Sequence, residues 1–307
     1  MSTNAPIALF IFNRPAHLRN TLAALMACEG FSAAPIFVFG DGPRLADDCA
    51  NVDAARKVAQ NMLGERAVYT FSEVNKGLAR SVIDGVSAVL QKHDRVIVLE
   101  DDLGLAPGFL SYVNAALDRY AQDDNVFQIS GHAFDAPELS QRSSAAFLPF
   151  IGTWGWATWR RAWRQMDEAA TGWQAIKEDA ALRRRFNLDG VYDYATMLER
   201  QMQGKRDSWG IRWYWSVFAR DGLVLYPPRT LVRNAGFDGS GSHGRGTLRR
   251  YGDSGQDFCS GTIELPAPAL DTAAFAAVKR AIARQNGGLA GKLADRVKKF
   301  AGKWLGR

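Results

Sequence analysis

The stretch VIVLEDDLGLAPGFL (residues 96–110) decides the fold class. Its first four residues are apolar, three of them β-branched, and they run directly into Glu100, Asp101 and Asp102. An apolar run without alternation is typical of a strand buried on both faces of a parallel sheet. Ligands of open α/β sheets bind outside the carboxyl ends of such strands, so the three acids stand where a ligand would bind.

The same pattern extends toward the N-terminus. Apolar runs predict three further strands, at residues 7–12, 35–39 and 66–71. Helical spacing of apolar residues predicts helices at residues 18–26, 47–63, 78–90 and 109–117. Alternating strands and helices predict an α/β fold whose mostly parallel (mixed) central sheet is flanked by helices. Beyond about residue 145 the periodicity fades, and tryptophan-dense segments follow (FIGTWGWATWRRAW and DSWGIRWYW).

Polar residues follow three of the four predicted strands. They are Asn13-Arg14-Pro15, Asp41-Gly42-Pro43 and the acidic triplet that ends with Asp102. Asp-Gly-Pro alone is more often a simple turn. Because the carboxyl ends of parallel strands meet at one edge of a sheet, we expect the three groups to converge on one site.

Three adjacent carboxylates repel one another unless a cation neutralises them. Oxygen ligands suit a hard divalent ion, Mn²⁺ or Mg²⁺, which also binds diphosphates. Alternation along the strand end predicts that Asp102 faces the metal and Asp101 faces the opposite way, toward a ribose or sugar hydroxyl. The alternative is a solvated acidic turn that caps the helix after Pro107. The chain has no GxxxxGK[ST], no GxGxxG after the first strand, no HExxH and no GxSxG, which leaves a fold that binds a nucleotide diphosphate through a metal.

Composition excludes several classes of protein. The chain has 307 residues, 47% hydrophobic, and a net charge of +6. Residues 272–307 contain nine basic residues and one acid, so they carry +8 and the remainder carries −2. A net acidic body argues against nucleic-acid binding. No apolar run reaches the roughly 18 residues of a membrane span. Three scattered cysteines suggest a reducing, cytoplasmic location.

Taken together, the motifs resemble glycosyltransferases with the GT-A fold, and most closely the N-acetylglucosaminyltransferase I family, whose metal motif also reads Glu-Asp-Asp-Leu. The similar segments keep the family's order over residues 5–251. They are IFNRP, FGDG, NKGLARSVIDGV, VIVLEDDLGLAPGFLSYVNAAL, FIGTWGWATWRRAW, DSWGIRW and GFDGSGSHG.

The resemblance implies a role for each matching residue. Asp102 would bind Mn²⁺, and Asp207 would be the general base. The donor-binding residues would be Arg14 and Asp41 at the nucleoside, Glu100 and Asp101 at ribose and sugar hydroxyls, and Ser242 and His243 in a loop that closes over the donor. The family has an aromatic residue before the base, where this chain has Arg206. That departure leaves the identity of the transferred sugar open.

The tryptophan-rich half is predicted to hold the acceptor. We expect Trp209 and its neighbours to desolvate Asp207 partly and so make it a better base; the alternative is that Asp207 caps a helix. We expect pocket walls at Trp159 and Trp163 and a sugar platform at Trp154 or Trp156. His243 is expected to contact the metal or a phosphate, or to be a solvated loop residue. His17, His93 and His132 are expected to be structural or exposed.

These observations predict two regions. Residues 1–270 form the catalytic domain, and residues 271–307 form a basic amphipathic helical tail that lies on an anionic membrane or packs on the domain. We expect a soluble, cytoplasmic enzyme. It would transfer N-acetylglucosamine or a related hexose, with inversion, from a UDP-sugar to a glycan or lipid-linked acceptor. The alternatives are a sugar nucleotidyltransferase, which should have a glycine-rich loop after the first strand, and a binding module without catalysis.

Overall fold

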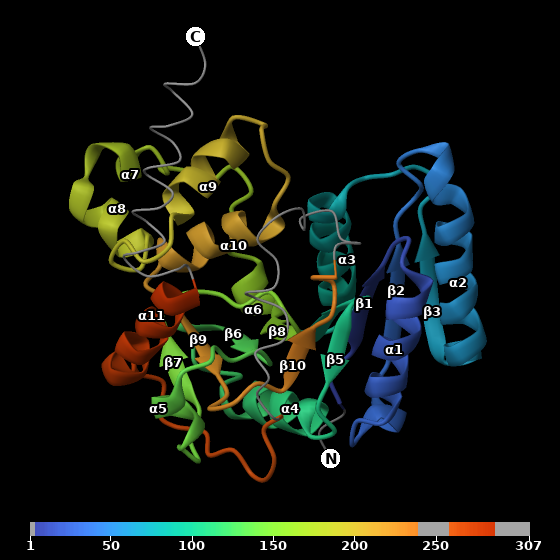
Figure 1. Cartoon of the computed structure of the whole chain (residues 1–307), viewed down its shortest axis with the longest axis horizontal. Coiled ribbons are helices and arrows are strands. Elements are labelled where there is room, and N and C mark those ends of the chain that lie inside the picture. Colours follow the sequence, from blue (N-terminus) through green and yellow to red (C-terminus); the bar gives the residue numbers. More distant parts are fainter. Residues whose placement is uncertain (1–3, 239–257, 286–307) are drawn as a thin grey trace.

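A computed structural model describes residues 4–238 and 258–285 and contains one large mixed β-sheet (Figure 1). Its eight strands have the order β3-β2-β1-β4-β8-β6-β9-β7. The four parallel strands are β1 (Ile7–Ile11), β2 (Ile36–Gly40), β3 (Ala67–Phe71) and β4 (Arg95–Glu100). The others are β6 (Val126–Ser130), β7 (Ala146–Leu148), β8 (Trp156–Trp159) and β9 (Leu223–Tyr226).

The direction of the sheet reverses at β8. This strand is antiparallel to both of its neighbours, β4 and β6, whereas β6 and β9 are parallel to each other. β7 closes the sheet as an antiparallel edge strand. The prediction of an α/β fold with a mostly parallel, mixed sheet is therefore confirmed, and the four predicted strands are β1 to β4. The four short strands of the second half were not predicted.

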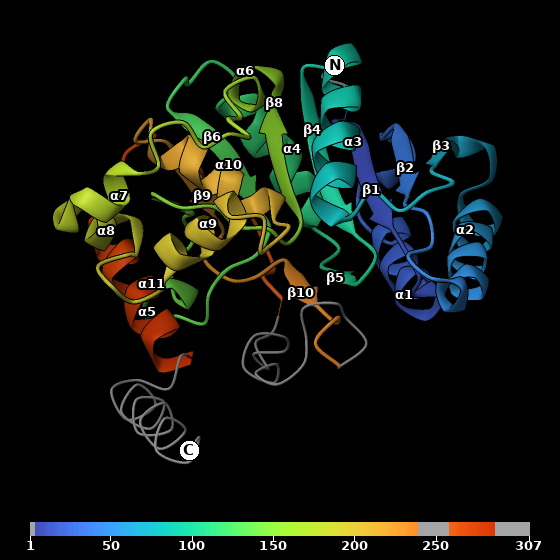
Figure 2. The ribbon, with the colours of Figure 1, turned by 90° about the horizontal axis from the view of Figure 1, so that it is seen from above.

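Helices cover both faces of the sheet (Figure 2). One face packs against α1 (Pro15–Met26), α2 (Cys49–Leu63) and α4 (Phe109–Arg119). The other packs against α3 (Leu78–Lys92), α6 (Arg160–Trp163), α10 (Trp209–Phe218) and α11 (Thr272–Gln285). The remaining helices are α5 (Pro137–Ser140), α7 (Ala175–Glu178), α8 (Ala180–Phe186) and α9 (Tyr194–Met202).

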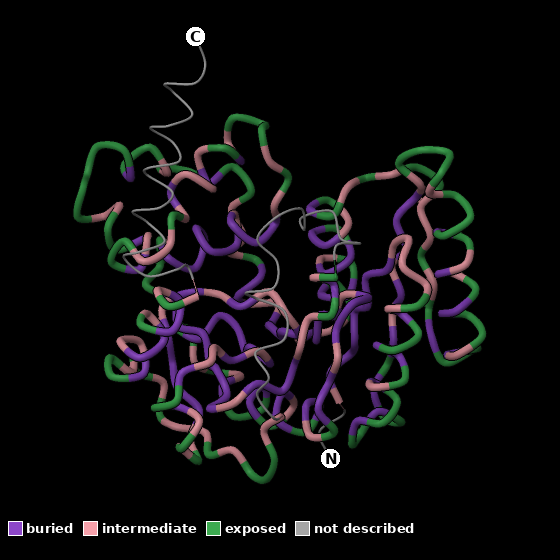
Figure 3. The backbone as a smooth tube through the Cα atoms, in the orientation of Figure 1, coloured by how far each residue is buried: buried purple, intermediate pink, exposed green. Residues whose placement is uncertain are grey.

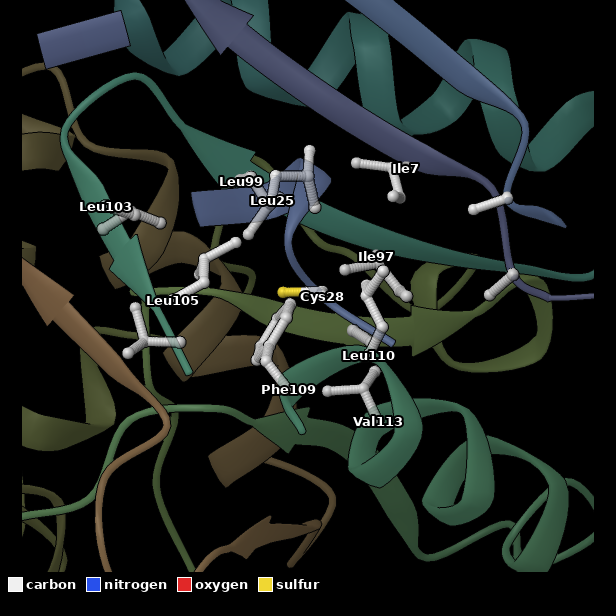
Figure 4. Close-up of a cluster of buried hydrophobic side chains, with 14 of the residues drawn as sticks. Ile7, Leu25, Cys28, Ile97, Leu99, Leu103, Leu105, Phe109, Leu110 and Val113 are labelled. Atoms are coloured by element: carbon white, nitrogen blue, oxygen red, sulfur yellow. The ribbon is translucent and has the colours of Figure 1, made fainter. Parts of the chain in front are cut away.

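The strands are buried on both faces because alternate side chains enter two separate cores. In β4, Ile97 and Leu99 enter the core with α1 and α4, while Val96 and Val98 enter the core with α3. Figure 4 shows the first core closing around the Cys28 thiol, whose pKa burial raises to about 11. The central strands are accordingly buried while the outer side of α2 is exposed (Figure 3).

A second, two-stranded sheet lies beside the end of β4. β5 (Leu103–Leu105) pairs antiparallel with β10 (Val232–Asn234), with Leu103 opposite Asn234. The pairing brings a segment from near residue 235 against the acidic turn between β4 and β5. The Ala235 N–H donates to the Asp102 carbonyl at 2.8 Å.

Most of the tryptophans form a core rather than a surface. Trp156 stacks on Trp209 with ring centroids 5.0 Å apart, and Trp163 contacts Trp213 at 5.0 Å. Trp156 and Trp213 are almost completely buried. Aromatic side chains thus hold β8, α6 and α10 together.

α11 packs on the body, although it lies within the predicted tail. Its apolar face enters the second core through Ala274, Val278 and Ile282, and Phe275 contacts Phe150. The rest of the predicted tail, residues 286–307, lies outside the described residues. Among the residues that the structure describes, no helix is both long enough and apolar enough to span a bilayer.

Candidate active site

The acidic turn and the first loop meet through one arginine. Arg14, between β1 and α1, places its Nη2 2.6 Å from Asp101 Oδ1 and 2.9 Å from Asp102 Oδ2. The Phe12 N–H donates to Asp101 Oδ2 at 3.0 Å. Thr21 of α1 donates its hydroxyl to the Asp101 carbonyl at 2.8 Å. The polar residues after β1 and β4 therefore converge, as the sequence predicts.

The charges in this cluster shift one another's pKa values. Burial raises the pKa of Glu100 to about 8, and Asp102 and Asp101 add to the rise while Arg14 opposes it. Burial also raises the pKa of Asp101, against the effect of Arg14. Burial lowers the pKa of Arg14, but the carboxylates of Asp101 and Asp102 outweigh it, so that its pKa is raised overall. A half-buried guanidinium between two buried carboxylates is a preformed charged site.

Two details of the acidic turn differ from the predictions. Asp101 and Asp102 do not face opposite ways, because both contact the same guanidinium. The physical reason is that β4 ends at Glu100, so the two aspartates occupy a turn in which strand alternation no longer holds. The turn also does not cap the next helix, because α4 begins at Phe109 with Gly108 as its N-cap.

Asp102 offers an oxygen that suits a hard cation. Its Oδ1 is buried and has no hydrogen-bond partner, an arrangement that costs free energy unless a ligand completes it. Gly236 lies so close that a β-carbon there would overlap Asp102 and approach Arg14 Nη1 to 2.7 Å. Within the described part of the chain, no three His, Cys, Asp or Glu side chains cluster to form a metal site. A single carboxylate fits a divalent ion that takes its other ligands from a diphosphate and water.

The carboxylate of Asp41 is occupied by its own chain. Oδ1 accepts from the N–H groups of Gly42 and Lys76, both at 2.9 Å. Oδ2 accepts from Asn75 Nδ2 and the Gly77 N–H, both at 3.0 Å. Four bonds fill the acceptor sites of a carboxylate. These bonds tie Asp41, which directly follows β2, to the loop that precedes α3.

Asp207 stands on the other side of the same loop. The Ala79 N–H in the first turn of α3 donates to Asp207 Oδ2 at 3.4 Å. Gly77 separates the two aspartates: its N–H binds Asp41, and a β-carbon at this position would lie 2.8 Å from Asp207 Oδ2. Gly77 has φ +80°, a conformation that favours glycine. One short loop therefore connects the carboxyl end of β2 with the predicted base.

Asp207 is exposed, contrary to the expected partial desolvation. Trp209, Trp213 and Trp215 all turn into the core and leave its carboxylate in solvent. The alternative in which Asp207 caps the helix is also wrong, because Ser208 is the N-cap of α10 and accepts from the Ile211 N–H.

The structure distinguishes between the roles predicted for the individual tryptophans. Trp154 is partly buried and lines a cavity, so it remains a candidate sugar platform. Trp156 is 1% exposed and is excluded as a platform. Trp159 ends β8 and Trp163 ends α6; both are buried core residues rather than pocket walls, and they lie in the two different cores.

The cavity beside Trp154, here called the aromatic cavity, has a volume of about 290 Å³. Sequence reasoning missed most of its lining. His132 is one such residue, with a ring 4.5 Å from that of Trp154 and a pKa that burial lowers to about 4. Tyr192 and Tyr194 are two others, and the two tyrosines on either side of Asp193, where α9 begins, were the available signal.

Two predicted donor residues cannot be placed, because Ser242 and His243 lie outside the described residues. The described start of that loop contacts α1, where His17 Nε2 lies 3.0 Å from Asp238 Oδ2. His17 is therefore paired near the acidic cluster.

No protein-family profile matches the chain. Several solved sugar transferases show a distant structural similarity. GalNAc-T7 with UDP, GalNAc and Mn²⁺ gives a TM-score of 0.38 at 12% identity, over 54% of this chain and 37% of its own. The mannosyltransferase PcManGT from Pyrobaculum calidifontis, with GDP-Man and Mn²⁺, gives 0.38 at 12% identity, over 71% and 73%. Glucosyl-3-phosphoglycerate synthase from Mycobacterium tuberculosis, with Mn²⁺ and UDP, gives 0.33 at 12% identity, over 53% and 58%. The chain thus spans little more than a third of the length of GalNAc-T7, and its similarity to these enzymes concerns the arrangement of strands and helices.

Proposed function

We propose that the chain is a metal-dependent glycosyltransferase with a GT-A-type fold, resembling the N-acetylglucosaminyltransferase I family. The donor is a UDP-sugar, of N-acetylglucosamine or a related hexose, and the acceptor is a glycan or a lipid-linked sugar. The observation that supports this most directly is the buried, unpartnered Oδ1 of Asp102 beside the Arg14–Asp101 ion pair. The names of the structurally similar enzymes, which include UDP, GDP-Man and Mn²⁺, agree with this choice.

The proposed site residues lie at two ends of the site and have different roles. Asp102 would hold Mn²⁺ or Mg²⁺, which supplies positive charge to the leaving diphosphate when it is bound. Arg14 adds a fixed positive charge at the same place, and Glu100 and Asp101 are proposed to hold donor hydroxyls. Asp41 holds the loop before α3 and is proposed to lie at the nucleoside.

Asp207 is the proposed general base. It would accept the proton of the acceptor hydroxyl as that oxygen forms its bond to the anomeric carbon and the bond from that carbon to the diphosphate breaks. Attack from the side opposite the leaving group inverts the configuration. The long hydrogen bond from the Ala79 N–H holds one carboxylate oxygen only weakly, and the exposure of the side chain leaves it accessible to an acceptor.

A sugar nucleotidyltransferase is the weaker alternative. That activity calls for a glycine-rich loop after the first strand, whereas here only Phe12, Asn13 and Arg14 separate the end of β1 from the start of α1 at Pro15.

The test measures nucleotide-sugar binding by isothermal titration with and without Mn²⁺, using UDP, GDP and CMP sugars. We expect the wild type to bind a UDP-sugar, and Mn²⁺ to strengthen this binding. Asp102→Asn should abolish the Mn²⁺ effect. Asp94→Asn is the matched control, because its side chain is 90% exposed and pairs with Arg160 on the surface. Unchanged Mn²⁺-dependent affinity in Asp102→Asn would refute the metal assignment.

We also propose that residues 286–307 bind an anionic membrane surface on the cytoplasmic side. They contain six basic residues and one acid, a net charge of +5. A chain that ends at Gln285 keeps α11, so it should stay folded and bind the donor. Co-sedimentation with phosphatidylserine vesicles at low salt should require residues 286–307 and weaken in high salt. Equal sedimentation of both chains would refute the proposal.

A further inference from the structure

The aromatic cavity has two aromatic walls from different parts of the chain. In the first wall, the His132 ring contacts Trp154 at 4.5 Å and Phe134 at 5.3 Å. In the second wall, Tyr194 contacts Tyr192 at 4.4 Å and Tyr214 at 4.7 Å. Trp154, Phe134, Tyr192 and Tyr194 are only partly buried, so part of their surface remains available. Flat apolar walls with a few polar groups suit a small organic ring, and the C–H face of a pyranose packs well on aromatic rings.

Arg206 contributes a positive charge to the lining of the aromatic cavity. Its Nε is buried and has no hydrogen-bond partner, and among the described residues its guanidinium forms no ion pair within 4.0 Å. Such a group is costly to leave unpaired in a partly buried position. A guanidinium presents a planar set of donors that matches a carboxylate or a phosphate. The missing partner of Arg206 is therefore expected to come from a bound anion.

The aromatic cavity adjoins the proposed base Asp207 on one side and the acidic turn with Asp102 on the other. Arg206 also lines the open depression that contains Asp207, so the cavity adjoins the proposed base. At the other side Trp154 contacts Phe237 at 5.4 Å, and Phe237 follows Gly236, which abuts Asp102. A sugar bound in the cavity would thus approach Asp207 and the acidic cluster together.

The remaining charged groups of the lining are compatible with a hydroxylated ligand. Asp135 lies beside the end of α11, where its carbonyl accepts from Arg284 at 3.3 Å. Arg233 stacks over Phe258 at 4.5 Å. The cavity continues to Ile282 and Gln285 of α11, on the opposite side of the molecule from β2 and β3 (Figure 1), which is the acceptor side if the nucleoside lies at β2.

We propose that the aromatic cavity is the acceptor site and that Arg206 selects a pyranose that carries a carboxylate or phosphate group. This inference rests on the proposed function and adds the chemical class of the acceptor. Trp154 supports the ring, Arg206 binds the anionic substituent, and Asp207 receives the proton of the hydroxyl that is glycosylated.

The experiment uses the full chain and three sugars as probes: methyl β-D-glucuronide, its neutral match methyl β-D-glucoside, and glucose 6-phosphate. Saturation-transfer NMR and titration would measure their binding without donor. We expect the wild type to bind at least one anionic sugar about ten-fold more tightly than the glucoside, the effect of one charge-assisted hydrogen bond. The comparison of glucuronide with glucose 6-phosphate then separates a carboxylate substituent from a phosphate.

Variants identify the residue responsible. Arg206→Met should remove the preference for the anionic sugar and leave glucoside binding unchanged, and Arg206→Lys should keep part of the preference. Arg184→Met on the exposed surface of α8 is the matched control and should change nothing. Trp154→Ala should weaken all three sugars.

UDP binding with Mn²⁺ is measured on the same samples, so that the two proposals fail separately. If UDP binds and the wild type shows no anionic preference, or Arg206→Met keeps that preference, the acceptor inference is wrong while the proposed function stands. If UDP does not bind, the proposed function is wrong, and the sugar titrations still decide whether the cavity binds anionic pyranoses.

Discussion

At the scale of single residues, Asp207 and Asp41 both lie against Gly77 but differ in their exposure and in their hydrogen bonds. Within the described part of the chain, Asp207 is exposed and accepts one weak hydrogen bond, whereas Asp41 is 9% exposed and accepts four. An exposed, lightly bonded carboxylate can exchange protons with an incoming hydroxyl. A saturated carboxylate mainly holds its surroundings in place.

For Asp207→Asn we expect the transfer rate to fall roughly 10²–10⁴-fold, the range for loss of a general base, while donor affinity is kept. Single-turnover kinetics with saturating donor would measure the rate, and titration would measure the affinity. Asp84→Asn, on the exposed face of α3, is the control. Loss of donor binding in Asp207→Asn would mean that the residue only supports the fold around α3.

For Asp41→Asn we expect a loss of stability. The amide nitrogen of asparagine would face two backbone or side-chain donors, and each unpaired donor costs about 1–3 kcal/mol. The free energy of unfolding should therefore fall by about 2–4 kcal/mol in denaturant titrations, compared with Asp53→Asn on the exposed side of α2. Unchanged stability together with lost nucleotide affinity would instead show that Asp41 binds the nucleoside directly.

His132 should make the protein less stable in mild acid. Its pKa is about 4 in the folded chain, below the ordinary value of 6.5, so the unfolded chain binds more protons between these values. Stability from neutral His132 is complete above about pH 6.5 and is lost as the pH falls toward 4. Glu100, with its raised pKa, acts in the opposite direction over part of this range.

The test for His132 therefore uses the difference between the wild type and His132→Asn. The stability advantage of the wild type should shrink by about 2 kcal/mol between pH 7.5 and pH 4.5 in denaturant titrations. A difference independent of pH would mean that His132 is solvated and titrates normally.

At the scale of elements, the small β5–β10 sheet brings Gly236 against the acidic turn. In Gly236→Ala the new methyl group would overlap Asp102 and crowd Arg14, so the cluster would have to move. We expect Mn²⁺-dependent UDP affinity to fall about ten-fold or more with little change in stability. Gly108→Ala is the control, because a β-carbon there meets nothing within 4 Å. Equal affinities in the two variants would show that the Gly236 contact does not shape the site.

Prediction from sequence succeeded for elements with a local signal. β1 to β4 and their helices were found because strands buried on both faces leave uninterrupted apolar runs, and amphipathic helices repeat every 3.6 residues. β6 to β10 have three to five residues each, and their pairing depends on partners distant in the chain, so no local pattern indicates them. The convergence of Arg14 with Asp101 and Asp102 followed from topology. The orientation of Asp101 and the exposure of Asp207 did not, because both depend on where a turn places one side chain.

At the scale of the whole molecule, the sheet has two parts joined at β8. The parallel part provides Arg14, Asp41 and the acidic turn, whereas the other part provides Trp154 and the cavity walls. The proposed donor and acceptor ends thus belong to different parts of one continuous sheet.

The antiparallel pairing of β8 with β4 also has a consequence for synthesis on the ribosome. β4 is complete at residue 100, but its second neighbour begins only at Trp156, so 55 residues must be made in between. At roughly 5–20 residues per second this takes about 3–11 s, during which the apolar edge of β4 lacks its partner. Unpaired strand edges are sites of aggregation, so chaperones should associate with nascent chains in this interval. Nascent chains stalled with residue 130 outside the exit tunnel should crosslink to trigger factor or Hsp70 more strongly than chains stalled with residue 240 outside, and equal crosslinking would show that the open edge is protected in another way.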